Sequence, residues 1–276
     1  MQRAAPTNRI LPETRWVAIL VIPFLVVAFL ILFFVPSRTG QLFAWKLQPT
    51  LTAMMLGSAY AGGVVFFGRV LMTKEWHRVK VGVLPVTAFA SLMGLATVLH
   101  WDRFNHAHVT FWAWAGLYFT TPFIVFAAWL RNRPLDPGSI EPGDQVVPLW
   151  LRILFGVAGV TTTAIAAAMF VSPAKLIPIW PWTITPLTAR VVSALFSLPG
   201  IVGLGLAFER RWSAAPFILQ AQGFSITLIL IGVARAWNEF KPDVGKWMFA
   251  GGLTLMLVGI AAVYLWMSSR REVLSA

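Results

Sequence analysis

Eight long apolar runs, separated by short polar stretches, divide the chain. They cover residues 16–35, 50–68, 81–99, 109–130, 149–171, 187–208, 214–236 and 247–268. Each run is close to the roughly 20 residues that a helix needs to cross the hydrocarbon core of a bilayer. The runs are continuously apolar and lack the alternation typical of membrane β-barrel strands. The pattern therefore predicts an all-α integral membrane protein with eight transmembrane helices.

The composition supports the same environment. The 276 residues are 58% hydrophobic and 12% charged, with a mean hydropathy of +0.74, whereas soluble domains carry about 25% charged residues. The first apolar run is longer than the 7–15-residue core of a typical signal peptide. We therefore expect it to be a retained span, and we expect the lipid bilayer to be the main partner of the chain.

The distribution of positive charge predicts the orientation. With eight spans, 14 of the 22 Lys and Arg residues fall on the side of the two termini and 8 on the other side. By the positive-inside rule, both termini are expected in the cytoplasm, and we expect a plasma-membrane protein. The formal charge of +12 is then mainly a topology signal. No clustered basic face predicts nucleic-acid binding, and the absence of cysteine excludes disulfides, thiolate metal ligands and iron–sulfur clusters.

The tryptophans reveal an internal repeat. Twelve of the fourteen form six pairs spaced by 134 to 137 residues: Trp16 and Trp150, Trp45 and Trp182, Trp76 and Trp212, Trp101 and Trp237, Trp112 and Trp247, Trp129 and Trp266. HWDRF at 100–104 also aligns with AWNEF at 236–240. The sequence therefore predicts a tandem duplication, with four-helix repeats at 1–130 and 149–276 joined by a cytoplasmic linker at 131–148.

The even number of spans in each repeat predicts their relative arrangement. Both repeats enter the membrane with the same orientation, which implies a parallel 4+4 duplication with a pseudo-twofold axis along the membrane normal. Inverted-repeat transporters have their axis in the membrane plane instead. The aligned outer loops differ in charge, because Arg103 aligns with Glu239. We predict a contact between the repeats through Arg103 and Glu239, or through Asp102 and Arg235; the alternative is solvated loop charges worth under about 1 kcal/mol.

Charged residues at the outer ends of the spans are candidates for ligand binding. Arg190 and Arg235 lie within a turn or so of the outer ends of their spans, and with Arg103 and Glu239 they form the predicted ligand-binding set. The alternative is that the arginines only extend towards the headgroups. Gln220 and Gln222 lie deeper in the seventh span, whereas no span carries a buried Asp or Glu. A proton-coupled pump is therefore disfavoured, since it needs a titratable group at depth.

The outer stretch LHWDRFNHAH offers a metal-ligand set. His100, Asp102, His106 and His108 supply three imidazoles and a carboxylate, which suit Zn, Cu or Fe. The H-x5-H-x-H spacing does not match the helical pair of H-E-x-x-H, and the alternative is an interfacial loop whose imidazoles only form hydrogen bonds. A single transition metal at the outer face is the cofactor hypothesis. Haem is disfavoured, because His77 is expected on the opposite side and no C-x-x-C-H motif is present.

Three classes of function follow from these features. We favour a non-catalytic membrane protein, either an accessory subunit with other membrane subunits as partners or a binder of a lipid-like, amphipathic ligand at the outer face between the repeats. The first alternative is a small-molecule transporter or channel along the inter-repeat axis, with a water-accessible cavity lined by the two glutamines and by Arg190 and Arg235. The second is a metal-dependent membrane enzyme that uses the 100–108 loop. No catalytic sequence motif is present.

Overall fold

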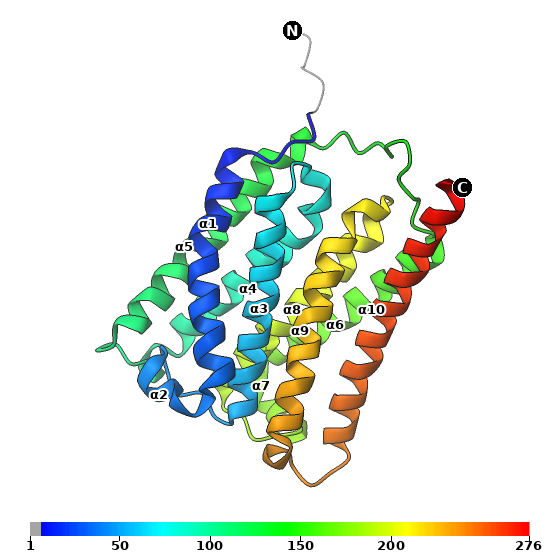
Figure 1. Cartoon of the computed structure of the whole chain (residues 1–276). Helices are drawn as coiled ribbons and strands as arrows, with labels where there is room; N and C mark the ends of the chain where they lie inside the picture. Colours follow the sequence, from blue (N-terminus) through cyan, green and yellow to red (C-terminus); the bar gives the residue numbers. More distant parts are fainter. Residues whose placement is uncertain (1–6, 276) are drawn as a thin grey trace.

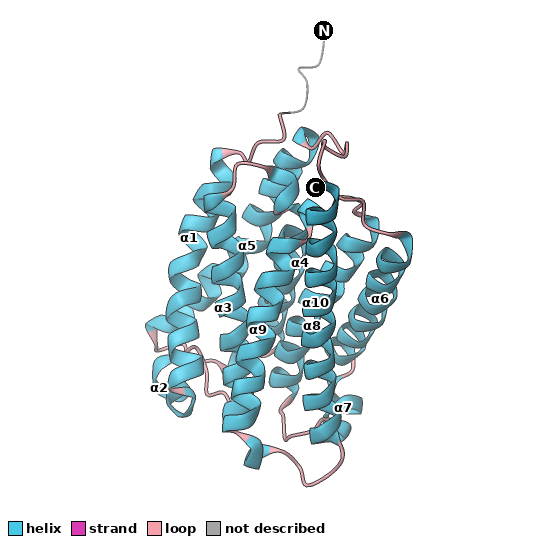
Figure 2. Ribbon diagram, turned by 45° about the vertical axis from the view of Figure 1, so that its right-hand side comes forward, coloured by secondary structure: helices cyan, strands magenta, loops and turns pink. Residues whose placement is uncertain are grey.

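The computed structural model describes residues 7–275, with side chains described as far as Arg270. Arg3 and the side chain of Arg271, both counted in the charge distribution above, lie outside this described part. Every regular element in it is a helix (Figures 1 and 2). Eight helices are long and apolar enough to cross a membrane. The prediction of a multi-pass, all-helical membrane protein is therefore confirmed.

The eight long helices agree with the predicted spans to within a few residues at most ends. They are α1 (Pro12–Phe29), α3 (Thr50–Met72), α4 (Lys80–Leu99), α5 (Val109–Asn132), α6 (Leu149–Val171), α8 (Pro186–Phe208), α9 (Pro216–Arg235) and α10 (Gly245–Ser275). A π-helical stretch, Leu30–Phe34, extends α1. Two short helices that the hydropathy pattern does not predict are α2 (Thr39–Leu42) and α7 (Pro173–Leu176).

The long helices run between two ends of the bundle. Residues 7–11, the 133–148 segment and the last turns of α10 lie at one end, at the top of Figure 1, and we call this the terminal end. The helices α2 and α7 lie at the opposite end, which we call the far end. Each of the eight long helices therefore runs between the terminal end and the far end.

Local sequence features explain where several helices begin. Proline occupies the first position of α1, α8 and α9, where its missing N–H group costs no helical hydrogen bond. The hydroxyl of Thr185 accepts a hydrogen bond from the Thr188 N–H at 3.2 Å and caps α8. The ring of His108 accepts one from the Thr110 N–H at 3.3 Å and caps α5. Such caps satisfy N–H groups that the first turn of a helix leaves unpaired.

The order of elements in residues 7–132, the first half, recurs in residues 149–275, the second half. Each half has a long helix, a short far-end helix and three further long helices, with a 3-10 turn that begins at tryptophan before each of the last two. At the terminal end, the Trp76 N–H donates to the carbonyl of Asn8 at 2.8 Å, and the Trp212 N–H donates to the carbonyl of Gln145 at 2.9 Å. The corresponding donors and acceptors are 136 and 137 residues apart.

Four helices form the centre of the bundle. The helix α4 packs against α8, and α3 packs against α9. In each of these two contacts, one helix comes from the first half and the other from the second half. Close approach of α3 and α9 requires glycine at position 62, because a Cβ there would overlap Ser225. The helices α1 and α6 lie outside α3 and α8, respectively. The helix α10 packs mainly on α9, and no residue of its most apolar stretch is buried.

Candidate ligand cavity

A cavity of about 410 Å³ lies among the four central helices and α10. Fourteen of its lining residues form seven pairs spaced by 136 residues, one member from each half. The pairs are Ala59 and Leu195, Gly62 and Leu198, Gly63 and Pro199, Phe66 and Val202, Gly82 and Ile218, Pro85 and Ala221, Val86 and Gln222. The cavity therefore lies between the two halves, surrounded by corresponding positions of both.

The lining of the cavity is apolar and carries no charged side chain. Its polar side chains are Thr162, Gln222 and Ser225. The amide nitrogen Nε2 of Gln222 is buried and has no hydrogen-bond partner within the described residues. A buried polar group without a partner costs free energy in an apolar environment. Gln222 is thus a lining residue whose amide nitrogen has unused capacity to donate a hydrogen bond.

The cavity reaches the lipid-facing surface beside α10. Among its lining residues, Met248 is 70% exposed, and Gly252 one turn later is also exposed. Aromatic contacts hold α10 to the rest of the second half near both of its ends: the rings of Trp150 and Trp266 are 5.4 Å apart, and those of Trp182 and Phe249 are 5.0 Å apart. Between these contacts, the apolar interior is accessible from the hydrocarbon region of a bilayer.

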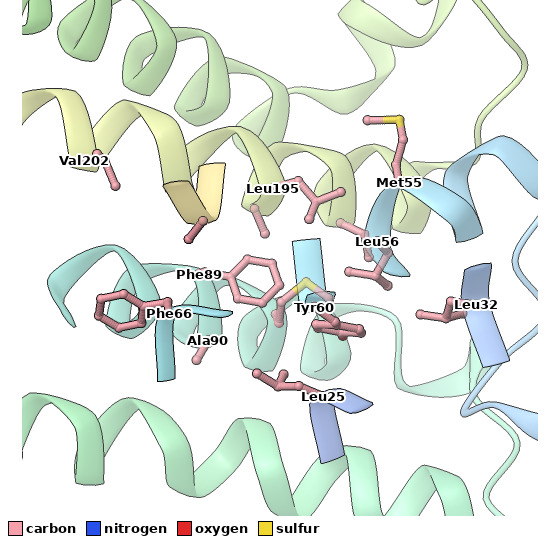
Figure 3. Packing of buried hydrophobic residues seen from close by; sticks show 14 of the residues in the cluster. Leu25, Leu32, Met55, Leu56, Tyr60, Phe66, Phe89, Ala90, Leu195 and Val202 are labelled. Atoms are coloured by element: carbon pink, nitrogen blue, oxygen red, sulfur yellow. The ribbon is translucent and has the colours of Figure 1, made fainter. Parts of the chain in front are cut away.

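The first half fills the corresponding space with aromatic side chains. The hydroxyls of Tyr60 and Tyr118 form a hydrogen bond of 2.7 Å. Phe89 and Trp114 pack against Tyr118, with ring centroids 6.0 and 4.3 Å away. Figure 3 shows Tyr60 and Phe89 within the buried cluster, with Leu195 of α8 near them and Val202 further along the same helix. All four aromatic residues are buried, so this region of the first half is closed.

Polar side chains close the bundle at the terminal end. His77 and Ser213, which are themselves 136 residues apart, meet through Nε2 and Oγ at 2.9 Å. On the other side of the ring, Nδ1 of His77 lies 2.7 Å from Nδ2 of Asn8, and the Ser213 hydroxyl is bonded to Asp144. Both His77 and Ser213 are buried. The two halves therefore meet here through a continuous chain of hydrogen bonds.

The direction of these hydrogen bonds argues against an activated serine. Oδ1 of Asn8 accepts a hydrogen bond from the His77 backbone N–H at 3.2 Å, which leaves the amide nitrogen of Asn8 to donate to Nδ1. The proton of the ring is then on Nε2, which donates to the Ser213 oxygen. A catalytic histidine would accept the serine proton at this nitrogen. Burial, followed by the positive charge of Arg211, lowers the pKa of His77, in agreement with a neutral ring.

A buried ion-pair network lies beside this contact. Arg211 is only 2% exposed. Its guanidinium donates to both carboxylate oxygens of Asp136, each at 2.8 Å, and through Nε to Glu209 at 2.9 Å. Lys80 at the start of α4 bonds to both carboxylates. Asp136 follows α5, and Glu209 and Arg211 follow α8, so the network joins the segment between the halves to the start of α4 and the end of α8.

The network perturbs the ionisation of its carboxylates. Burial alone would raise the pKa of Glu209, but the hydrogen bonds from Arg211 and Lys80 outweigh this effect and lower it to about 2. The same opposing causes leave the pKa of Asp136 well below its usual range. Both groups are therefore charged at neutral pH, as a bidentate pair with arginine requires.

The predicted ion pairs between the outer loops are not formed. Within the described residues, neither Arg103 and Glu239 nor Asp102 and Arg235 make a salt bridge; Arg103 pairs with the neighbouring Asp102 at 3.2 Å, and both are largely exposed. Glu239 instead binds the first turn of α3, accepting hydrogen bonds from the N–H groups of Thr50 at 3.1 Å and Leu51 at 2.8 Å. Unpaired N–H groups and the helix dipole attract a carboxylate there. The halves do meet through Glu239, but its partners are the backbone N–H groups and the Thr50 hydroxyl, which donates at 2.6 Å.

The two predicted arginines also bind within the far end. Arg190 lies 2.7 Å from Nε2 of His100, and because a guanidinium can only donate, this nitrogen of the ring is the acceptor. Burial and then the charge of Arg190 lower the pKa of His100. Arg235 donates to the carbonyl of Phe33 at 2.8 Å. Neither arginine lines the cavity, so the structure separates the predicted ligand-binding residues from it.

The structure does not bring the four candidate metal ligands together. His106 stacks on Trp101, with ring centroids 5.0 Å apart, while His108 caps α5 and His100 binds Arg190. In residues 7–270, whose side chains the structure describes, no three His, Asp or Glu side chains are placed to hold a metal ion. The metal-site prediction gains no support from this arrangement.

Sequence reasoning identified Gln222 as a deep polar residue, but it grouped that residue with others that lie elsewhere. Gln220 forms hydrogen bonds with Arg69 at 3.0 Å and with Tyr264 at 2.8 Å. The contact between His77 and Ser213 was missed, although both follow a paired tryptophan. Comparison of the chain with protein-family models, curated proteins and solved structures found no match to any of them.

Proposed function

We propose that this protein is a non-catalytic membrane protein that binds a lipid-like molecule in the cavity between its two halves. The observation that carries the proposal is an uncharged, apolar cavity that is accessible from the side, next to α10. Ligand sites are typically concave and mostly apolar with a few polar groups. The sequence placed the ligand at the outer face, whereas the proposal now places it among the spans, because the cavity is there.

We propose that the two halves arose by tandem duplication and are related in parallel about an axis along the membrane normal. The recurring order of elements, the matched contacts of Trp76 and Trp212, and the paired lining residues support it. The reciprocal packing of α3 on α9 and of α4 on α8 is what a twofold relation would produce. In the proposed orientation, the terminal end faces the cytoplasm and the far end faces outwards at the plasma membrane.

The transporter or channel remains the alternative, favoured by one specific observation: the cavity lies between the halves, as substrate sites do in repeat-built transporters. Against it, of the four polar residues expected to line a water-filled path, only Gln222 lines the cavity. The terminal end is also blocked by the buried contact between His77 and Ser213. For the metal-enzyme alternative, elemental analysis of the purified protein is the direct test, with a His106→Ala, His108→Ala variant as control.

The test of the proposed function uses two adjacent glycines of α10. Gly252 lines the cavity, whereas Gly251 is not part of its lining, and a Cβ at either position meets nothing within 4 Å. We expect the purified protein to retain a lipid-like molecule in native mass spectrometry, Gly252→Phe to lose it, and Gly251→Phe to keep it. Equal retention by both variants would contradict the proposal.

A further inference from the structure

The unpaired amide of Gln222 limits the chemistry of the ligand. Gln222 lines a cavity without charged residues, and its Nε2 is buried and has no partner among the described residues. The corresponding position in the first half is Val86, which also lines the cavity. The two halves thus present an aliphatic and an amide side chain at matched positions, and only the amide can form a hydrogen bond.

Building on the proposed function, we infer that the cavity takes an uncharged, long-chain lipid with one carbonyl or hydroxyl oxygen, and that Gln222 selects it through that oxygen. The amide can donate to a carbonyl or hydroxyl oxygen and can accept from a hydroxyl. A hydrogen bond from the ligand would remove the cost of the unpaired buried group. An ionised headgroup has no counter-charge in this lining and would be costly to bury.

The positions of Gln222 and the opening determine how the ligand lies. Gln222 is near the terminal end of α9, because that helix begins there at Pro216. The exposed lining residue Met248 is near the far end of α10, which begins at Gly245. The oxygen of the ligand is then held towards the terminal end, and the chain extends along the cavity towards the opening beside α10.

The experiment compares two probes of equal chain length, oleyl alcohol and cis-9-octadecene, that differ only by the hydroxyl oxygen. Binding of each radiolabelled probe to the purified full-length protein is titrated in detergent. Wild type should bind the alcohol about two- to tenfold more tightly, the range expected for one net hydrogen bond. Gln222→Met, similar in size, should reduce this preference to about one. Thr227→Val is the matched control, because Thr227 is exposed on the same helix and bonds to the carbonyl of Gly223 at 2.8 Å.

The Tm of Gln222→Met, measured without ligand, shows whether this variant is folded. Without ligand, Gln222→Met removes an unpaired buried amide and should melt at or above the wild-type Tm. Retention of the alcohol preference by Gln222→Met would overturn the assignment of Gln222. Equal binding of both probes to wild type, with loss of both in Gly252→Phe, would also overturn it but support the cavity as a lipid site. Failure of both probes to bind wild type would contradict the inference and the proposed function together.

Discussion

The two halves of the bundle differ in how tightly side chains pack at positions that correspond in sequence. In the first half, Tyr60, Phe89 and Tyr118 fill the space between the helices. In the second half, the residues 136 positions after Tyr60 and Phe89 are Phe196 and Ser225, and both line the cavity. Replacement of a phenyl ring by a hydroxymethyl group removes much of the volume that would close it. The same helical framework therefore supports a closed core on one side and an open site on the other.

The position of the last helix in each half shows the same difference. The helix α5 packs on α4 and also contacts α1, whereas α10 packs mainly on α9. A structural protein gains packing contacts by closing such a gap, since interiors are normally close-packed. The open space beside α10 is therefore the feature on which the proposed binding function rests.

The largest effect is expected from the network that holds both halves at the terminal end. Arg211→Met leaves the buried carboxylates of Asp136 and Glu209 with Lys80 as the remaining cation. Breaking a buried ion pair by removal of one partner costs about 3–5 kcal/mol. Unfolding in mixed detergent–SDS micelles should show this loss, while the exposed neighbour Arg210→Met should change stability by less than about 0.5 kcal/mol. Equal effects of both substitutions would contradict the structural role of the network.

A smaller effect should separate the closed half from the open one. Trp114→Ala creates a cavity in the packed aromatic cluster and should cost about 3 kcal/mol, in the range of such truncations. The corresponding change, Phe249→Ala, enlarges a space that lipid can already enter, and should cost about 1–2 kcal/mol because little new void is created. The same unfolding assay measures both. If Phe249→Ala costs as much as Trp114→Ala, the second half is as tightly packed as the first.

The last effect concerns acid and acts through the same ion-pair network. The pKa of Glu209 is lowered from 4.5 to about 2 in the folded protein, and that of Asp136 is lowered as well. Folding therefore favours the ionised carboxylates, and their contribution is complete above about pH 5 and lost as the pH falls towards 2. The Tm should decrease over this range in wild type, and the decrease should be smaller in Arg211→Met. An identical pH profile in the variant would show that other groups control acid stability.

The spans and the spacing of the halves were readable from the sequence for a physical reason. A bilayer imposes a nearly fixed helix length and an apolar surface, and these constraints apply to every run independently. The Trp pairs are visible because tryptophan is generally rare in proteins and easily aligned. The contact partners of individual side chains, by contrast, do not follow from such patterns. Glu239 met a helix N-terminus and not Arg103, since which groups come within 3 Å depends on loop conformations that no periodic pattern encodes.

The cavity was hidden from sequence analysis for a similar reason. Its lining is ordinary apolar residues, and the open space depends on where α10 lies relative to α8. Gln222 was visible as a costly polar group within a span, but its neighbour Gln220 carried the same signal while having two hydrogen-bond partners. Three-dimensional packing distinguishes the satisfied amide from the unsatisfied one.

An electron cryomicroscopy map of the full-length protein in lipid nanodiscs would test the central claim most directly. The account predicts elongated non-protein density that enters beside α10 and extends to Gln222, and its absence from Gly252→Phe. An empty cavity in the wild-type map, or α10 packed against α8 with the space closed, would contradict the assignment of a lipid-binding site between the halves.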